Sequence, residues 1–202
     1  MVNELLRKFI LLFAVIDPIG TIPVFLAVTK SFDKTIRFKV ALRACVAAGC
    51  ILLFFIVAGQ VLIEHMGISL AAFQVAGGLI LLIFALTMIF GKEAHSDGKE
   101  ISDYQHVAIF PMAIPAIATP GAILAVILLT DNNVYDIGQQ VVVAITMLVV
   151  IIITFFLLLS ANGIQKVIGV TGITVITKIM GLLLCGIATE SMLAGVKTYF
   201  KI

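Results

Sequence analysis

The sequence predicts an all-α integral membrane protein with six transmembrane helices. Hydrophobic residues make up 62% of the 202 residues, charged residues make up 12%, and the mean hydropathy is +1.24. A soluble domain is about 45–50% apolar and about 25% charged, so most of this apolar surface needs lipid as its solvent. Six apolar runs are each long enough to cross a bilayer as a helix, and they lack the alternation of a barrel strand.

The expected spans cover residues 5–29, 39–62, 69–90, 106–130, 138–160 and 173–196. No cleavage site of small residues follows the first span, so we expect a retained helix rather than a signal peptide. The net charge of +2 is too small to indicate nucleic acid as a partner. The cysteines lie in apolar segments without metal-ligand spacing and are expected to be packing residues: Cys45, Cys50 and Cys185. We therefore expect no metal and no cofactor.

Positive charges predict the orientation of the bundle. They gather at the first, third and fifth connections, namely at Lys30, Lys34, Arg37, Lys39, Arg43, Lys92, Lys99, Lys166 and Lys178. The opposite side has only Arg7, Lys8, Lys197 and Lys201. Because cytoplasmic ends are enriched in Lys and Arg, both termini are expected on the non-cytoplasmic side.

The chain is expected to be an internal repeat of three helices. Asp17–Pro18–Ile19–Gly20 interrupts the first span, and Thr119–Pro120–Gly121 interrupts the fourth about 102 residues later. Similar apolar runs begin at Gly77 and Met180, which are 103 residues apart. An odd number of helices in each unit makes the second copy inverted, an architecture common among secondary transporters. The expected units of the single transmembrane domain are residues 1–90, a polar cytoplasmic linker at 91–105, and residues 106–202.

Spans 1 and 4 are expected to be discontinuous. Proline cannot donate a helical hydrogen bond and its ring clashes with the preceding turn. The two spans hold all five prolines of the chain: Pro18, Pro23, Pro111, Pro115 and Pro120. At about 1.5 Å of rise per residue, both interruptions fall near the middle of a hydrocarbon core about 30 Å thick. Irregular backbone at that depth requires surrounding protein or water, so the interruptions predict a cavity.

Interrupted helices at the midplane suggest a site for a zwitterion. Exposed N–H groups at a helix start attract an anion, and exposed carbonyl groups at a helix end attract a cation. The expected donors are Gly20, Thr21, Gly121 and Ala122, with the Thr21 and Thr119 hydroxyls as polar partners and Pro18 and Pro120 as the residues that break each helix. These small uncharged side chains predict a small neutral ligand, such as an amino acid.

Two carboxyl groups are candidates for a coupling proton. Asp17 lies near the bilayer centre, where it is expected either to face the cavity and bind an ammonium group or a proton, or to cap the half-helix that follows. Both roles are compatible. Glu190, in the outer part of the sixth span, is expected either to face the pathway or to reach the membrane surface.

The segment F-A-V-I-D-P-I-G-T-I-P-V-F-L, from Phe13 to Leu26, closely resembles the opening signature of the MarC family. The resemblance extends over the whole chain and includes A-I-A-T-P-G-A-I in span 4 and K-I-M-G-L-L-L in span 6. It implies a bacterial or archaeal inner-membrane protein, distantly similar to the lysine-exporter superfamily, with small neutral amino acids as substrates. Many members of that family have Asn at the position of Asp17 and Gly at that of Thr119.

Together these patterns predict an alternating-access transporter of a small neutral amino acid such as glycine or alanine, with proton coupling open. Its partners would be this small-molecule substrate and the lipid bilayer. A transporter or exporter of another small solute or of a cation, and a structural membrane protein without transport, are the alternatives. An enzyme is not expected, because the sequence lacks the motifs of a nucleophile with its base or of a metal site.

Overall fold

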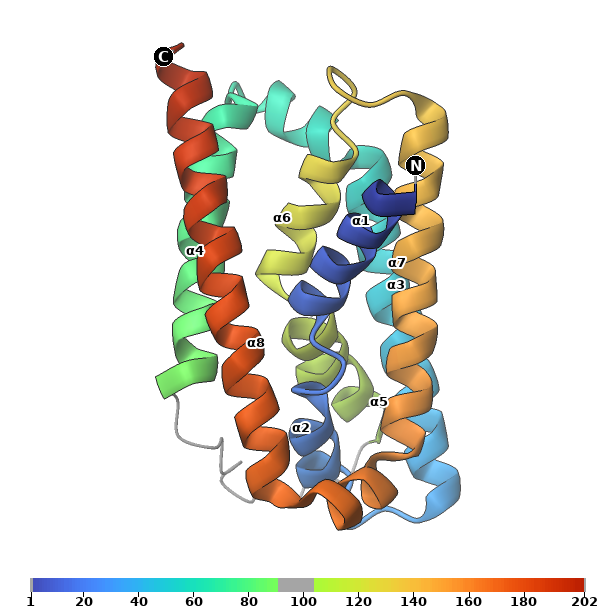
Figure 1. The fold of residues 1–202 in the computed structure, drawn as a ribbon. Coiled ribbons are helices and arrows are strands. Elements are labelled where there is room, and N and C mark those ends of the chain that lie inside the picture. Colours follow the sequence, from blue (N-terminus) through green and yellow to red (C-terminus); the bar gives the residue numbers. More distant parts are fainter. Residues whose placement is uncertain (1, 91–103, 202) are drawn as a thin grey trace.

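The computed structural model describes residues 2–90 and 104–201, and within these ranges it consists of helices and their connections. Figure 1 shows an upright bundle with both termini at its upper end. The elements are α1 (Val2–Ile16), α2 (Thr21–Val28), α3 (Lys34–His65), α4 (Leu70–Phe90), α5 (Tyr104–Val107), η1 (Ala108–Ile117), α6 (Pro120–Leu129), α7 (Ile137–Leu159) and α8 (Ala161–Phe200).

The helices confirm a multi-pass membrane protein with five or six spans. Within the described residues, five segments are long and apolar enough to cross a bilayer, and the first of them, Asn3–Val28, contains both α1 and α2. The fourth span along the chain is a bent pair, in which Tyr104–Ile117 meets α6 at an angle of 58°. Spans 1 and 4 are both interrupted, as expected. The expected linker lies outside the described residues except for its last two, Tyr104 and Gln105, which open α5.

Some helices extend beyond their expected ends. The second span was expected at 39–62, but α3 begins at Lys34 because the Asp33 carboxylate caps it, accepting from Ile36 N at 2.7 Å. The sixth span is continuous in sequence with a short helical segment after Ser160, and the two are separated by a kink at Gly169 with φ of 74°. Because the residues at these ends are polar, a hydropathy pattern does not show where the helices begin.

Residues at corresponding positions of the two halves make the same kinds of helix caps and turns. Asp136 caps α7 as Asp33 caps α3, also at 2.7 Å and 103 residues later. The hydroxyls of Thr29 and Thr130 end α2 and α6 by donating to a carbonyl four residues earlier. Gly67 and Gly169 both have a positive φ, 71° and 74°, at the turn before the last helix of each half. The paired residues are 101 to 103 positions apart in sequence.

The closest helix packing joins α4 and α8, which lie side by side in Figure 1. A Cβ added at Gly78 would lie 3.0 Å from the Ala188 carbonyl, and one added at Gly181 would lie 3.1 Å from the Ala85 carbonyl. Gly78 corresponds to Gly181 and Ala85 to Ala188, each 103 residues apart. Exchanging the halves therefore turns one contact into the other, which is the relation produced by a two-fold axis.

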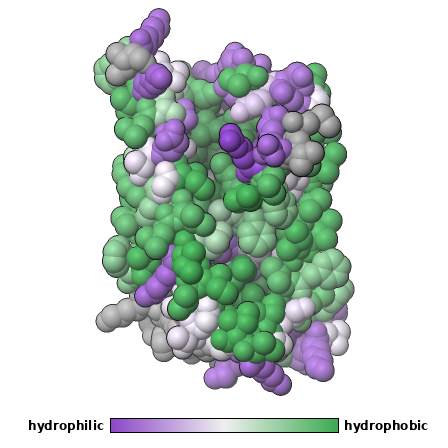
Figure 2. Space-filling model, viewed as in Figure 1, coloured by the Kyte–Doolittle hydropathy of each residue, from purple (hydrophilic) through white to green (hydrophobic). Residues whose placement is uncertain are grey.

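The surface of the bundle is apolar where a membrane would cover it. Figure 2 shows hydrophobic residues across the middle of the visible face and hydrophilic residues gathered toward its upper and lower ends. Large apolar side chains such as Val57 and Phe90 are 79% and 77% exposed. A soluble protein would not tolerate such a surface, so lipid must cover it.

Candidate functional site

The first break lies between α1 and α2. Asp17 ends α1 with a left-handed backbone, φ of 50°, and its own N–H donates to Phe13 O at 3.0 Å. Its side chain turns toward the start of α2, where Oδ1 accepts from Gly20 N at 3.0 Å. The Thr21 hydroxyl donates to Pro18 O at 2.8 Å. The Asp17 carboxylate thus accepts a hydrogen bond within the turn before α2, whose N-cap residue is Gly20 and has no side-chain cap.

The second break lies between η1 and α6. The backbone of η1 is extended at Phe110 and Ile114, each of which precedes a proline, so this half of the span is interrupted at two positions. Thr119 then caps α6, and its hydroxyl oxygen accepts from Ala122 N at 2.9 Å. Asp17 and Thr119, 102 residues apart, thus use the same device: each accepts from the N–H three residues later.

The two breaks touch each other. The Thr119 hydroxyl donates to the carbonyl of Val15, at the end of α1, at 2.8 Å. Val15 and Thr119 are both fully buried. This hydrogen bond joins residues 104 positions apart in sequence, and it places the carboxyl end of α1 beside the amino end of α6.

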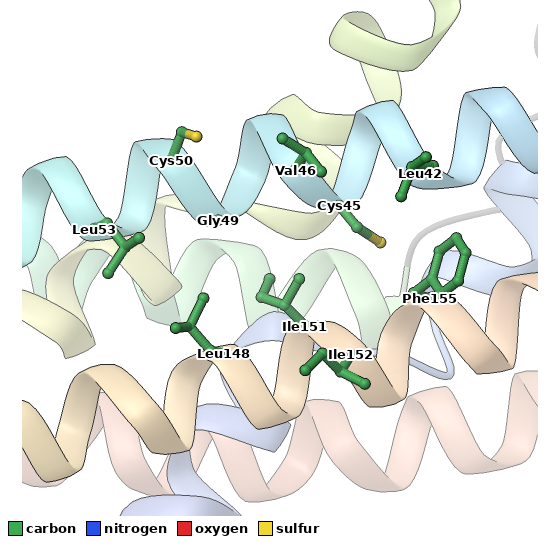
Figure 3. A pocket seen from close by; sticks show the side chains of 10 residues that line it. All are labelled: Leu42, Cys45, Val46, Gly49, Cys50, Leu53, Leu148, Ile151, Ile152 and Phe155. Atoms are coloured by element: carbon green, nitrogen blue, oxygen red, sulfur yellow. The ribbon is translucent and has the colours of Figure 1, made fainter.

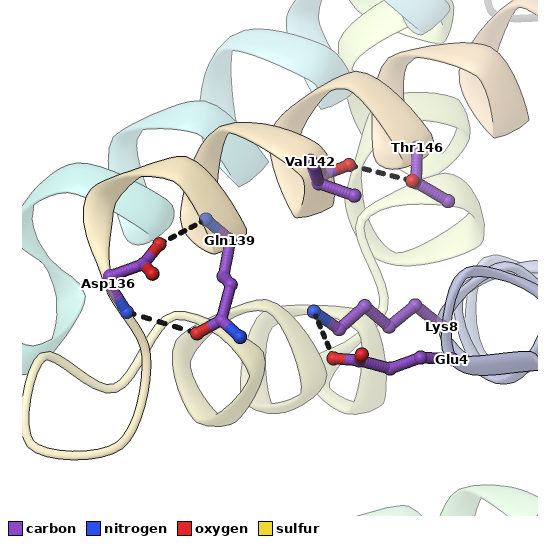
Figure 4. Close-up of polar contacts among 6 residues, drawn as sticks. All are labelled: Glu4, Lys8, Asp136, Gln139, Val142 and Thr146. Carbon is purple, nitrogen blue, oxygen red and sulfur yellow. Dashed lines mark hydrogen bonds and ion pairs between the residues drawn. The ribbon is translucent and has the colours of Figure 1, made fainter. Parts of the chain in front are cut away.

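The site contains a buried carboxyl group without a cationic partner. Asp17 is only 5% exposed, and no ion pair joins it to any residue of the described ranges. The ion pair that the structure does show, Lys8 with Glu4 at 3.3 Å, lies near the amino end of α1 (Figure 4). An ionised carboxylate at this depth is unfavourable unless a proton or a cation neutralises it.

Most of the predicted site residues gather around this contact. Asp17, Pro18, Thr21, Thr119, Gly121 and Ala122 are buried, Gly20 is half-buried, and Pro120 is exposed. Glu190 is different, because its side chain is exposed on α8 and has no hydrogen bond or ion pair to a described residue.

The expected free donors are largely occupied. Gly20 N and Ala122 N donate to the side chains of Asp17 and Thr119, and Thr21 N donates to Asp17 O at 3.1 Å. The Cα of Gly121 packs against Leu81 of α4. Most N–H groups at the breaks thus already have acceptors within the protein. A ligand there would have to replace these internal hydrogen bonds.

Comparison with known proteins places the chain in a family. The model of the MarC family integral membrane proteins matches residues 2–200. The chain belongs to the MarC family. Relatives named UPF0056 membrane protein include one from Methanocaldococcus jannaschii, 36% identical over 200 residues, covering 95% of this chain and 97% of the relative. Another is YvbG from Bacillus subtilis, 32% identical over 208 residues, covering 100% of this chain and 98% of the relative. No solved structure matches the chain.

The MarC family is thus found in both bacteria and archaea, and its members are integral membrane proteins. Because the match covers nearly the whole chain, both breaks of this MarC protein lie within the matched region.

Some features of the site carry no local sequence signal. The Val15 carbonyl belongs to a backbone that any residue could supply, and Leu81 is one of many leucines. Away from the site, Lys8 is a further example: it is 6% exposed and its Nζ lies 5.1 Å from the centre of the Tyr135 ring, which links α1 to the connection between α6 and α7. A matched 102-residue spacing was the only signal that could have paired the breaks.

Proposed function

We propose that this MarC protein is a secondary transporter of small neutral amino acids such as glycine and alanine, with its substrate site between the two breaks. The observation that carries the proposal is the Thr119–Val15 hydrogen bond beside the buried Asp17. It brings together two helix starts and two helix ends within the bundle. Such ends offer partial charges of both signs, as a zwitterion requires.

The substrate groups would exchange with internal ones. At present Gly20 N donates to Asp17 and Ala122 N donates to Thr119. A substrate carboxylate would accept from these two N–H groups in place of the side chains. A substrate ammonium group would then pair with the Asp17 carboxylate. This exchange keeps each buried polar group bonded, which limits the cost of opening the site.

The proposed substrate is small because the site is crowded. A Cβ added at Gly20 would lie 2.6 Å from Cγ of Asp17, and the Cα of Gly121 already packs against Leu81. Ala118 and Ala122 are fully buried. To bind an amino acid with a large side chain, the helices around the breaks would have to separate further than they would for alanine or glycine.

A transporter of monovalent cations is the second candidate. It is favoured by Asp17, a buried carboxyl at the carboxyl end of α1 that lacks a cationic partner among the described residues. The same negative helix end would suit a metal cation as well as an ammonium group. Competition between labelled glycine and sodium or potassium separates the two candidates.

Transport by purified protein in liposomes tests the proposal. We expect labelled glycine or alanine to enter at a rate above that of empty liposomes, and Asp17→Ala to reduce the rate at least tenfold. Thr119→Val, which removes the bond to Val15, should also reduce it, whereas Thr119→Ser should retain most of it. Uptake equal to that of empty liposomes for every neutral amino acid would refute the proposal.

Proton coupling is part of the proposal and has its own test. Asp17→Asn keeps an oxygen that can accept from Gly20 N but cannot gain or lose a charge. Because the amide oxygen can still accept from the substrate ammonium group, we expect this variant to exchange glycine more slowly than the wild type and to lose the response to an imposed pH gradient. Glu190→Gln should keep that response. If Glu190→Gln loses it instead, Glu190 carries the proton and Asp17 does not.

A further inference from the structure

We propose that the groove between α3 and α7 binds one acyl chain of an anionic membrane phospholipid, with the lipid phosphate held at Lys39. The groove has a volume of about 320 Å³, within the range of about 300–1,000 Å³ that is typical of small-molecule sites. Figure 3 shows its lining, which is Leu42, Cys45, Val46, Gly49, Cys50 and Leu53 from α3 with Leu148, Ile151, Ile152 and Phe155 from α7. The inference does not depend on the proposed transport.

Gly49 marks the place where the two helices leave room. A Cβ added at Gly49 would meet no atom within 4 Å, whereas one added at Gly78 or Gly181 would press against the neighbouring helix. Protein interiors are close-packed, and atoms beside a void lose their dispersion contacts. A space kept open between two packed helices is therefore favourable only if another apolar group fills it.

The chemistry of the lining selects a hydrocarbon chain. All ten lining residues have apolar side chains or thiols, or lack a side chain. A polar solute would lose its hydrogen bonds to water there without replacement, so an amino acid is a poor occupant. Val46 and Ile152 are 57% and 53% exposed, which means that the groove opens sideways onto the bilayer. Acyl chains are the molecules that surround this opening.

The length of the groove matches one leaflet. From Leu42 to Leu53 the helix rises about 16 Å, close to half of a hydrocarbon core about 30 Å thick. Leu53 lies just beyond the middle of α3, whose ends are Lys34 and His65. The groove thus runs from the bilayer centre toward the end of α3 that carries Lys39.

Lys39 is placed to bind the head group. It precedes Leu42 by three residues and so lies on the same face of α3, one turn beyond the end of the groove. Its side chain is exposed and has no ion-pair partner among the described residues. The rings of Phe38 and Phe155, 5.6 Å apart, flank this end. Basic side chains at a helix end attract anionic lipids, above all on the cytoplasmic side predicted for Lys39.

Native mass spectrometry of the detergent-solubilised full chain tests the inference. With added phosphatidylglycerol we expect one bound lipid per wild-type chain. Gly49→Leu, which fills the groove, should lower this occupancy at least fivefold. Gly186→Leu is the matched control, because Gly186 is exposed on α8 and a Cβ there also meets no atom within 4 Å. Lys39→Gln should keep the lipid but lose the preference for phosphatidylglycerol over phosphatidylethanolamine.

A second measurement needs no substitution in the groove. Cys50 lines the groove and is exposed, and Cys185 lies outside it on α8. Bound phosphatidylglycerol should slow maleimide labelling of Cys50 severalfold and leave that of Cys185 unchanged. Equal lipid occupancy in Gly49→Leu and Gly186→Leu, or unprotected Cys50, would overturn the inference. A wild-type dimer that Gly49→Leu converts to monomers without losing lipid would assign the groove to a second copy of the chain and overturn it as well.

Discussion

At the residue scale, Gly20 allows the backbone and the Asp17 side chain to adopt their conformations at the first break. Its Cα lies against the Asp17 carboxylate, so a side chain at this position has no room while that carboxylate accepts from the Gly20 N–H. The same carboxylate accepts the Gly20 N–H. Gly20 thus supplies both the space and the donor that keep a carboxyl group buried between two half-helices.

Gly20→Ala should displace the Asp17 carboxylate and destabilise the protein by about 1–3 kcal/mol, as overpacking does. Asp17→Ala removes the carboxylate with which a Cβ at position 20 would clash. Gly20→Ala should therefore lower the free energy of unfolding much less in the Asp17→Ala background. Gly186→Ala is the control, because it has open space around it. Detergent-denaturation titrations measure these free energies. Equal costs of Gly20→Ala with and without Asp17 would contradict this explanation.

The residues of the site could be predicted from sequence only in part. Pro18, Pro120 and their glycines act on the local backbone, so the two breaks were predicted from the positions of these residues in the sequence. The closed state of the breaks was not. Which N–H groups are occupied depends on the side-chain torsions of Asp17 and Thr119, and the bond to Val15 depends on tertiary packing.

At the scale of the elements, α4 and α8 form the most extensive contact of the bundle. Small residues allow this approach: Gly78 meets the Ala188 carbonyl and Gly181 meets the Ala85 carbonyl. The sequence predicted both helices as spans, since hydropathy reports burial in lipid. It could not predict that they pair, because hydropathy is the same for a helix facing lipid and a helix facing protein.

Gly78→Leu and Gly181→Leu should each destabilise the protein, by similar amounts of about 1–3 kcal/mol, because the two positions are equivalent. The double variant should cost less than the sum, since either substitution alone separates the helices. Gly186→Leu, on the same helix as Gly181, should be close to neutral. The measurement is again unfolding in mixed detergents, and a Gly78→Leu protein as stable as Gly186→Leu would count against this packing.

At the scale of the whole molecule, the charge distribution predicts how the bundle is oriented in the membrane. Both termini lie at one end of the bundle (Figure 1), and the connection between α2 and α3 lies at the other, together with Lys30 and Lys34. If Lys and Arg face the cytoplasm, Ser31 is cytoplasmic and Val134, between α6 and α7, is not.

Cysteine labelling in intact bacterial cells tests this orientation. In a background with Cys45, Cys50 and Cys185 replaced by Ala, Val134→Cys should react with a membrane-impermeant maleimide. Ser31→Cys should react only after the membrane is permeabilised. Both positions are exposed, so access rather than burial decides the outcome. The reverse pattern would place both termini in the cytoplasm.

The pairing of Asp17 with Thr119 has a thermodynamic consequence. If two identical halves were related by a two-fold axis, exchanging the conformations of the halves would leave the energy unchanged, and the chain would populate the two conformers related by that rotation equally. Only residues that differ between equivalent positions can make the two populations unequal. At the centre of this molecule one half has an ionisable acid where the other has an alcohol, so binding of a single proton would favour one of the two conformers over its rotated counterpart.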